Sequence, residues 1–178
     1  MSLTFHNIRV NVNGKVHSAR VESRRLLSDF LRDDLGLTGV HVGCEHGICG
    51  TCTIIFNGEL SRSCLFFAVQ ADGATILTLE GLERNGEIHP IQQAFIENNA
   101  FQCGFCTPGM IMTSYALLKE IPHPSDDEIK EHISGNLCRC TGYVNIIEAI
   151  HSAAAKEPQE LGRNASGSTK SPPKDGNF

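Results

Sequence analysis

A short cysteine-rich loop decides the fold. Residues 43–52 read GCEHGICGTC, and with the next cysteine they give the spacing C-x4-C-x2-C-x11-C. Three cysteines therefore lie on one tight loop, with a single distant fourth. Structural zinc sites usually pair their ligands in two short C-x(2–4)-C units, whereas this spacing is the plant-type pattern of a [2Fe–2S] cluster. The spacing predicts an iron–sulfur site with four ligands: Cys44, Cys49, Cys52 and Cys64.

Glycines are interleaved with the cysteines of this loop, at Gly43, Gly47 and Gly50. Glycine lets the backbone turn back on itself and approach closely. A loop wrapped round a cluster points amide N–H groups at sulfur, and such bonds help to set the reduction potential. An ordinary surface turn would also use glycine, but the alternation with cysteine favours a role in holding the cluster.

The remaining four cysteines form a second group, separated from the first by the longest gap between neighbouring cysteines. They are Cys103, Cys106, Cys138 and Cys140. Each pair precedes a predicted helix, and a helix start favours a thiolate through its free N–H groups and positive dipole end. Antiparallel helices can bring both starts to one end of a bundle. We therefore expect the four thiolates to converge, instead of being inert buried side chains.

Disulfides and zinc are the alternative uses for eight cysteines. A scaffold with four disulfides is disfavoured, because the chain is longer than typical disulfide-dense domains and shows no secretory signal. Two zinc sites of four thiolates each would make the chain a structural module or a thiol redox sensor. The spacing of the first group disfavours this interpretation but leaves it open to test.

Composition and charge disfavour several classes of partner. The 178 residues include 15 Lys and Arg and 20 Asp and Glu, a net charge of −5. A nucleic acid or an anionic membrane is therefore not the expected main partner. No run of about 18 apolar residues is present, so we predict no membrane span. We expect a cytoplasmic protein, with periplasmic export through a partner's signal as the alternative.

The first 82 residues predict a small α+β domain with a mixed sheet. Alternating apolar residues and the Asn13-Gly14 pair predict a hairpin over 3–22, and Asn57-Gly58 predicts a second tight turn. The other predicted elements are a helix over 24–35, a strand over 53–56, its return strand over 62–67 that contains Cys64, and a last strand over 75–79.

Residues 83–151 predict a four-helix bundle. Helices are expected over 90–98, over 107–119 with Thr107 as N-cap, over 126–134 behind a Ser125–Glu128 capping box, and from Thr141 as N-cap to about residue 150. Residues 152–178 are rich in Pro, Ser and Gly. Such a segment cannot bury a core, so we expect a flexible or partner-docking tail.

Three motifs together resemble the iron–sulfur subunit of molybdenum hydroxylases, the xanthine oxidase family, which includes bacterial aldehyde, carbon monoxide and N-heterocycle dehydrogenases. They are residues 43–52, QCGFCTPG at 102–109 and GNLCRCTGY at 135–143. The resemblance covers residues 3 to about 150. It departs at Thr51, where the family more often has Ala or Ser.

The resemblance implies a ferredoxin-like β-grasp domain and a helical domain, each with one [2Fe–2S] cluster. The two cysteine groups match the ligands of these clusters. Gln102 matches a residue that hydrogen-bonds the pterin of the molybdenum cofactor, and Cys140 matches the position of electron entry. The implied partners are a large molybdopterin-binding subunit and a medium FAD-binding subunit, in a heterotrimer or a dimer of heterotrimers. No catalytic residue or substrate site is expected on this chain.

The implied function is electron transfer, one electron at a time, from the molybdopterin site through the two clusters to FAD or to an external acceptor. The alternative is a free-standing two-cluster ferredoxin that shuttles electrons between separate proteins. A shuttle needs only residues 1–82, so the added helical domain and Gln102 favour permanent docking to a partner.

Overall fold

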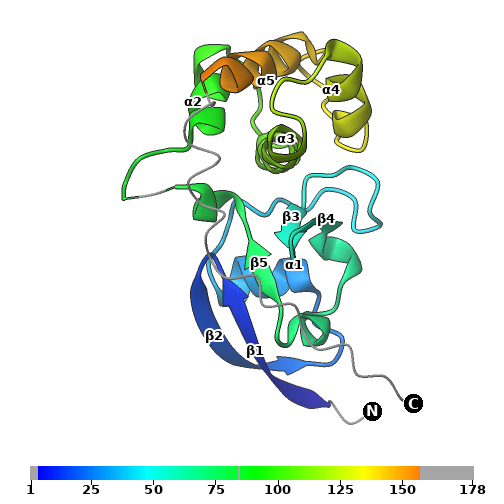
Figure 1. The fold of residues 1–178 in the computed structure, drawn as a ribbon. Coiled ribbons are helices and arrows are strands. Elements are labelled where there is room, and N and C mark those ends of the chain that lie inside the picture. Colours follow the sequence, from blue (N-terminus) through cyan, green and yellow to red (C-terminus); the bar gives the residue numbers. More distant parts are fainter. Residues whose placement is uncertain (1–3, 84, 157–178) are drawn as a thin grey trace, which may run out of the picture.

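The computed structural model describes residues 4–83 and 85–156. The N-terminal half is built on a mixed five-stranded sheet with the order β2-β1-β5-β3-β4. Its strands are β1 (Phe5–Val12), β2 (Lys15–Glu22), β3 (Thr53–Phe56), β4 (Glu59–Arg62) and β5 (Thr75–Leu77). Strands β1 and β5 run parallel, and the other neighbours are antiparallel. The helices of the C-terminal half lie above this sheet domain in Figure 1. The predicted α+β architecture is confirmed.

Both predicted hairpin turns are present. The Asn13-Gly14 turn joins β1 to β2, with Val12 opposite Lys15, and its two residues have φ values of 53° and 80°. Asn57 and Gly58 join β3 to β4 with φ values of 50° and 94°. These positive values are the conformation of the turn that suits the twist of two antiparallel strands.

The predicted helix over 24–35 is shorter than expected. It consists of α1 (Leu27–Asp29), which continues into a π-helical turn, η1 (Phe30–Asp34). Residues 23–24 before it form a turn, and Leu26 is extended because it forms a β-bridge with Phe67. Leu27, Phe30 and Leu31 are completely buried and belong to the core of the sheet domain.

The predicted return strand over 62–67 is wrong. Strand β4 ends at Arg62, and Cys64 lies in a 3₁₀ turn, η2 (Ser63–Leu65). The cause is Ser63, whose N–H and hydroxyl both donate to the Cys52 carbonyl, at 3.2 and 2.9 Å. These bonds fold the chain back, and they bring Cys64 close to Cys52.

Strand β5 also ends early, at Leu77 instead of residue 79. The Thr78 N–H donates to the Asn13 side chain at 2.9 Å, away from the sheet ladder. A 3₁₀ turn, η4 (Leu79–Leu82), then leads toward the helices, whereas the 3₁₀ turn η3 (Ala68–Ala71) precedes β5.

The C-terminal half contains four helices: α2 (Pro90–Glu97), α3 (Thr107–Glu120), α4 (Asp126–Ile133) and α5 (Val144–Lys156). Helix α3 lies between the sheet domain and the other helices (Figure 1) and contacts β3 and β4. Its buried side chains share one core with Phe95, Ile129 and Ile150 of the other three helices. The predicted helical domain is therefore present.

The helix starts agree only in part with the prediction. The Ser125–Glu128 capping box of α4 is confirmed. Helix α3 has Cys106 as its N-cap, so Thr107 is the first helical residue and not the cap. Helix α5 starts at Val144, because Gly142 and Tyr143 have φ values of 63° and 68°, which interrupt a helix from Thr141.

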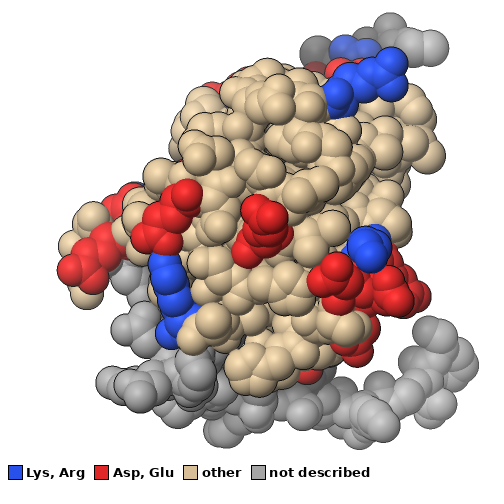
Figure 2. Space-filling view, turned by 90° about the horizontal axis from the view of Figure 1, so that it is seen from above, with Lys and Arg blue, Asp and Glu red and all other residues tan. Residues whose placement is uncertain are grey.

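Helix α5 extends to Lys156, so residues 152–156 are helical instead of belonging to the expected tail. Ala153 and Ala154 of this last turn are buried in the helical core. Residues 157–178, the rest of the expected tail, lie outside the described residues. In the described part of the chain, no helix has the length and apolar character that crossing a membrane requires. Seen from above, the molecule is mostly covered by uncharged residues, with separate acidic and basic side chains among them (Figure 2).

Candidate iron–sulfur sites

In the first cysteine group, backbone N–H groups of the loop point at the Cys44 sulfur. The Cys49 N–H donates to Cys44 Sγ at 3.4 Å. Backbone N–H groups of Cys49, His46 and Ile48 lower the pKa of the Cys44 thiol to about 6. Gly47 has a φ of 83°, which helps to turn the loop back over these sulfur atoms. This part of the loop therefore favours a thiolate.

The other two cysteines of the group, Cys52 and Cys64, lie next to each other. Burial, and then the neighbouring Cys52 thiol, raise the pKa of Cys64 to about 12. Cys44 also acts on Cys64, and the Gly47 N–H reaches its sulfur. The structure thus brings Cys44, Cys49, Cys52 and Cys64 together as two neighbouring pairs, 44 with 49 and 52 with 64.

The second group joins two distant segments of the chain. Cys140 Sγ lies 3.6 Å from Cys103 Sγ. Burial, and then the neighbouring Cys138 thiol, raise the pKa of Cys106 to about 12. Each pair thus takes one cysteine from the start of α3 and one from the loop before α5. All four predicted residues come together.

Thr141 gives Cys138 a different environment from Cys106. Burial works against the Cys138 thiolate, but the hydroxyl and N–H of Thr141 act in the opposite direction and hold the pKa of Cys138 below its ordinary value. The hydroxyl oxygen lies 3.1 Å from Cys138 Sγ and the amide nitrogen 3.5 Å. One member of this inner pair is therefore poised to be a thiolate.

The donors of both groups fit a two-iron cluster. In the described residues no three His, Cys, Asp or Glu side chains gather closely enough to hold one metal ion. The cysteines instead lie in pairs, and a [2Fe–2S] cluster needs four thiolates shared between two irons. Next to Cys106, the buried Thr107 hydroxyl has no hydrogen-bond partner among the described residues. A donor therefore remains there for a bound group.

At Gly50 the backbone segments of the two cysteine groups contact each other. The Leu137 N–H, next to Cys138, donates to the Cys49 carbonyl at 2.9 Å. Gly50 has a φ of 75°, and a Cβ at this position would overlap the Gly135 carbonyl oxygen. A Cβ at Gly109 of α3 would overlap the Gly50 carbonyl oxygen. The two cysteine groups therefore meet through direct backbone contact, which only glycine permits.

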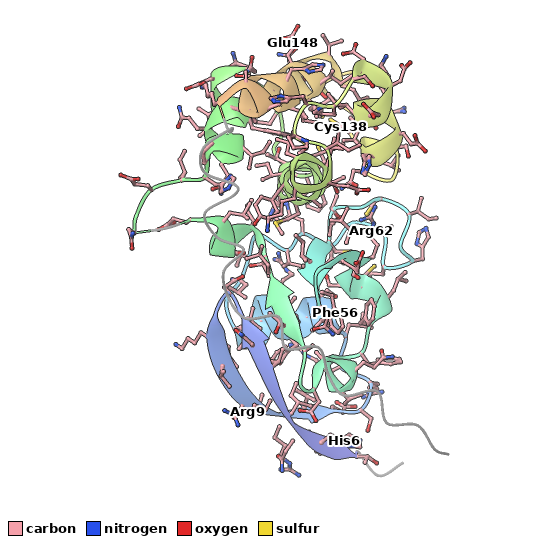
Figure 3. All side chains as sticks on the ribbon, in the orientation of Figure 1. His6, Arg9, Phe56, Arg62, Cys138 and Glu148 are labelled. Carbon is pink, nitrogen blue, oxygen red and sulfur yellow. The ribbon has the colours of Figure 1, made fainter. Side chains whose placement is uncertain are left out.

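A buried network of hydrogen bonds stabilises the contact between the two halves. The Asn136 side chain is 1% exposed, donates to the Gly50 carbonyl at 3.0 Å and accepts from the Thr113 hydroxyl at 3.0 Å. Arg62 donates to the Gly135 carbonyl at 2.8 Å and to Asn136 Oδ1 at 3.3 Å. Figure 3 shows Arg62 at the boundary of the two halves and Cys138 on the helical side. We call these residues, Gly50, Arg62, Thr113, Gly135 and Asn136, the junction.

The two ends of the second group differ in exposure. Cys103 and Cys140 are exposed, whereas Cys106 and Cys138 are partly buried. Gln102 is exposed next to Cys103. The outer pair is thus open to the surroundings, and the inner pair lies toward the junction.

The sequence pattern singled out Gly50 but gave no role to the other residues of the junction. Arg62 and Gly135 are 73 residues apart, and neither stands next to a cysteine. Asn136 and Gly109 do lie inside the quoted motifs, so a polar amide and a glycine beside the cysteines were the available signals. Gly43 was expected to turn the chain, but its φ is not positive. A Cβ there would lie 3.2 Å from Cys49 Sγ, so its role is close approach.

Two family models match the chain. One, a 2Fe-2S iron–sulfur cluster binding domain, matches residues 10–75, and the other, a [2Fe-2S] binding domain, matches residues 78–151. The chain therefore contains two [2Fe–2S]-binding domains, one for each cysteine group.

The chain matches two named relatives over nearly their whole length. Caffeine dehydrogenase subunit gamma of Pseudomonas sp. (strain CBB1) is 57% identical over 155 residues, which cover 85% of this chain and 93% of the relative. The nicotinate dehydrogenase small FeS subunit of Eubacterium barkeri is 50% identical over 149 residues, with 84% and 95% covered. A chain of quinoline 2-oxidoreductase from Pseudomonas putida 86 superposes with a TM-score of 0.82 at 48% identity, over 85% of this chain and 94% of that chain.

Proposed function

Because this chain belongs to the small iron–sulfur subunits of the molybdenum hydroxylases, the xanthine oxidase family, we propose that it is the electron-transfer subunit of such a complex. Electrons then leave the molybdopterin cofactor of a large subunit one at a time. They reach FAD on a medium subunit, or an external acceptor, by way of this chain. The substrate is oxidised on the large subunit, in a heterotrimer or a dimer of heterotrimers.

In this proposal each cysteine group holds one cluster. Cys44, Cys49, Cys52 and Cys64 provide the thiolates in the sheet domain, and Cys103, Cys106, Cys138 and Cys140 provide those in the helical domain. A bound [2Fe–2S] cluster supplies one-electron redox chemistry. Gly43, Gly47 and Gly50 keep the first loop close to its cluster, and the N–H groups aimed at Cys44 stabilise its thiolate.

The observation that carries the proposal is the junction. At the junction the Asn136 side chain donates to the Gly50 carbonyl at 3.0 Å, and the neighbouring Leu137 N–H donates to the Cys49 carbonyl at 2.9 Å, so the segments that carry the two cysteine groups are in direct contact. The hydrogen bonds of the Asn136 side chain to Thr113 and Gly50 are buried, which keeps the distance between the two cysteine groups fixed. The contact therefore gives the two sites a short, fixed connection, as the proposed electron path requires.

The exposure of the second group supports a direction of electron transfer through the chain. The outer pair, Cys103 and Cys140, is open, and Gln102 stands beside it. We infer that this end faces the pterin of the large subunit, with Gln102 as hydrogen-bonding partner and Cys140 at the point of electron entry. The inner pair leads across the junction to Cys49 and the sheet domain. The first group then serves the FAD subunit or an external acceptor.

Metal analysis of anaerobically purified native protein tests the proposal. We expect about four iron and about four acid-labile sulfide per chain, and two distinct EPR signals after reduction with dithionite. Zinc without labile sulfide would contradict it and would support the structural module. Co-purification separates the remaining alternative, because the proposal requires two larger chains at fixed ratio. A chain that keeps both signals but purifies alone would be a free-standing shuttle.

A further inference from the structure

The loop after Cys138 places a hydroxyl against a sulfur. Thr141 Oγ1 lies 3.1 Å from Cys138 Sγ. The same oxygen accepts the Tyr143 N–H at 3.1 Å. A hydroxyl has one proton, and Cys138 is the acceptor within reach once the oxygen accepts from Tyr143. The Thr141 N–H also reaches this sulfur, at 3.5 Å, so the residue presents two donors to Cys138.

Tyr143 holds this hydroxyl in place from two sides. Its N–H fixes the Thr141 oxygen, and its phenol oxygen accepts the Cys138 N–H at 2.9 Å. The phenol then donates to the Asn136 carbonyl at 3.4 Å. Residues 136–143 therefore form one folded loop around Cys138, and the position of the Thr141 hydroxyl is set by that loop.

Thr51 in the first group offers an internal comparison. Its Oγ1 lies 3.3 Å from Cys49 Sγ, and the residue is 4% exposed. Its proton, however, is donated to the His41 carbonyl at 3.0 Å. The two threonine oxygens are thus at similar distances from a cysteine sulfur, but only Thr141 has its proton free to point at the sulfur.

We propose that Thr141 is a positioning residue whose hydroxyl donates a hydrogen bond to the Cys138 thiolate and thereby raises the reduction potential of the helical-domain cluster. The inference rests on the proposed function. A hydrogen bond to a ligand sulfur stabilises the more negative state, and reduction adds one electron without breaking a bond. Thr51, with its proton directed elsewhere, has no corresponding effect on the first cluster.

A redox titration of the full chain, followed by the two EPR signals, tests this assignment. Thr141→Val removes the hydroxyl at nearly constant volume, Thr141→Ser retains it, and Thr51→Val is the matched control. We expect Thr141→Val to lower the reduced-to-oxidised ratio of one signal about tenfold at a fixed potential, which for one electron corresponds to about 59 mV. Thr141→Ser and Thr51→Val should stay within about twofold of the parent.

Three results would overturn the assignment: an unchanged potential in Thr141→Val, an equal shift in Thr141→Ser, or loss of the same signal from both Thr141 variants. If the cluster is lost from Thr141→Val but kept in Thr141→Ser, the hydroxyl still acts at the sulfur and the assignment is supported. The parent protein separates this inference from the proposed function. If the parent shows two EPR signals and co-purifies with two larger chains, the proposed function stands even where the potentials do not move.

Discussion

The two cysteine groups are assembled in different ways. In the sheet domain three cysteines share one loop, and the fourth sits in a turn that Ser63 ties to the Cys52 carbonyl. In the helical domain each pair takes one cysteine from before α3 and one from before α5. The first site therefore depends on local loop geometry. The second exists only when the helices are packed, so its integrity reports on the whole bundle.

Removing one ligand from each group gives the largest expected effect. Cys49→Ser and Cys106→Ser should each lower the iron content of the chain by about half, with loss of one EPR signal, because each cluster needs four thiolates. The measurement is iron per chain together with EPR. Loss of all iron in either variant would show that the groups are not independent sites.

Gly50→Ala should break the connection between the two groups. The new Cβ would overlap the Gly135 carbonyl oxygen and come within 2.8 Å of the Asn136 side chain, at a φ of 75°. Overpacking and backbone strain together should lower the free energy of unfolding by about 3 kcal/mol.

Gly36→Ala is the matched control for this variant, since Gly36 has a φ of 73° and no atom within 4 Å of an added Cβ. It should carry the backbone strain alone, about 1 kcal/mol. Denaturant unfolding of both variants measures the difference. Equal losses would mean that the junction does not depend on the missing side chain.

Asn136→Ala tests the polar part of the junction. It leaves the buried Thr113 hydroxyl without its acceptor and removes one hydrogen bond each from the Gly50 carbonyl and the Arg62 guanidinium, which keep their bonds to Thr53 and Gly135. The loss should cost about 2 kcal/mol of unfolding free energy. Asn145→Ala removes an amide that donates to the Asn98 carbonyl near the surface and should cost about 1 kcal/mol or less. A larger loss for Asn145→Ala than for Asn136→Ala would argue against the network.

The smallest expected effect concerns the exposed contact between α4 and α5. His151 lies 2.7 Å from the Asp126 carboxylate, and this contact holds the pKa of Asp126 below its ordinary value of 3.8. The contribution of this contact to the free energy of unfolding is therefore complete above the ordinary pKa of Asp126. It is lost as the pH falls through the lowered pKa. Asp126→Asn should lower the melting temperature by about 2 °C near neutral pH. The difference should vanish in strong acid, and a constant difference at every pH would contradict this origin.

Features set by short-range chemistry were predictable from the sequence. The Asn-Gly pairs produced both hairpin turns, and Ser125 with Glu128 produced the capping box, because each depends on residues within a few positions. The spacing of the cysteines likewise separated two groups, and the structure brings each group together. Local signals were therefore sufficient for the architecture and for the composition of the sites.

Features set by contacts distant in the sequence were not predictable. Arg62 looked like the start of a strand that carries Cys64, but its side chain bonds to Gly135 and the strand ends there. Thr141 looked like a helix cap, whereas its hydroxyl faces Cys138 and α5 starts later. The partner of Arg62 lies in a separate loop, and no pattern within residues 62–67 indicates it. Cys138 is only three residues from Thr141, but the positive φ values of Gly142 and Tyr143, which delay the start of α5, depend on how this loop folds.

The different origins of the two sites have a consequence for biosynthesis. The ribosome releases the N-terminal half first, and domains generally fold as units in that order. All four cysteines of the sheet domain are then available long before Cys138 and Cys140 have been made. We expect maturation to proceed in sequence, with the sheet domain loaded first. Gly50 then remains uncovered until α3 arrives, so the nascent chain has an interval in which its first cluster is more open to oxygen than in the finished subunit.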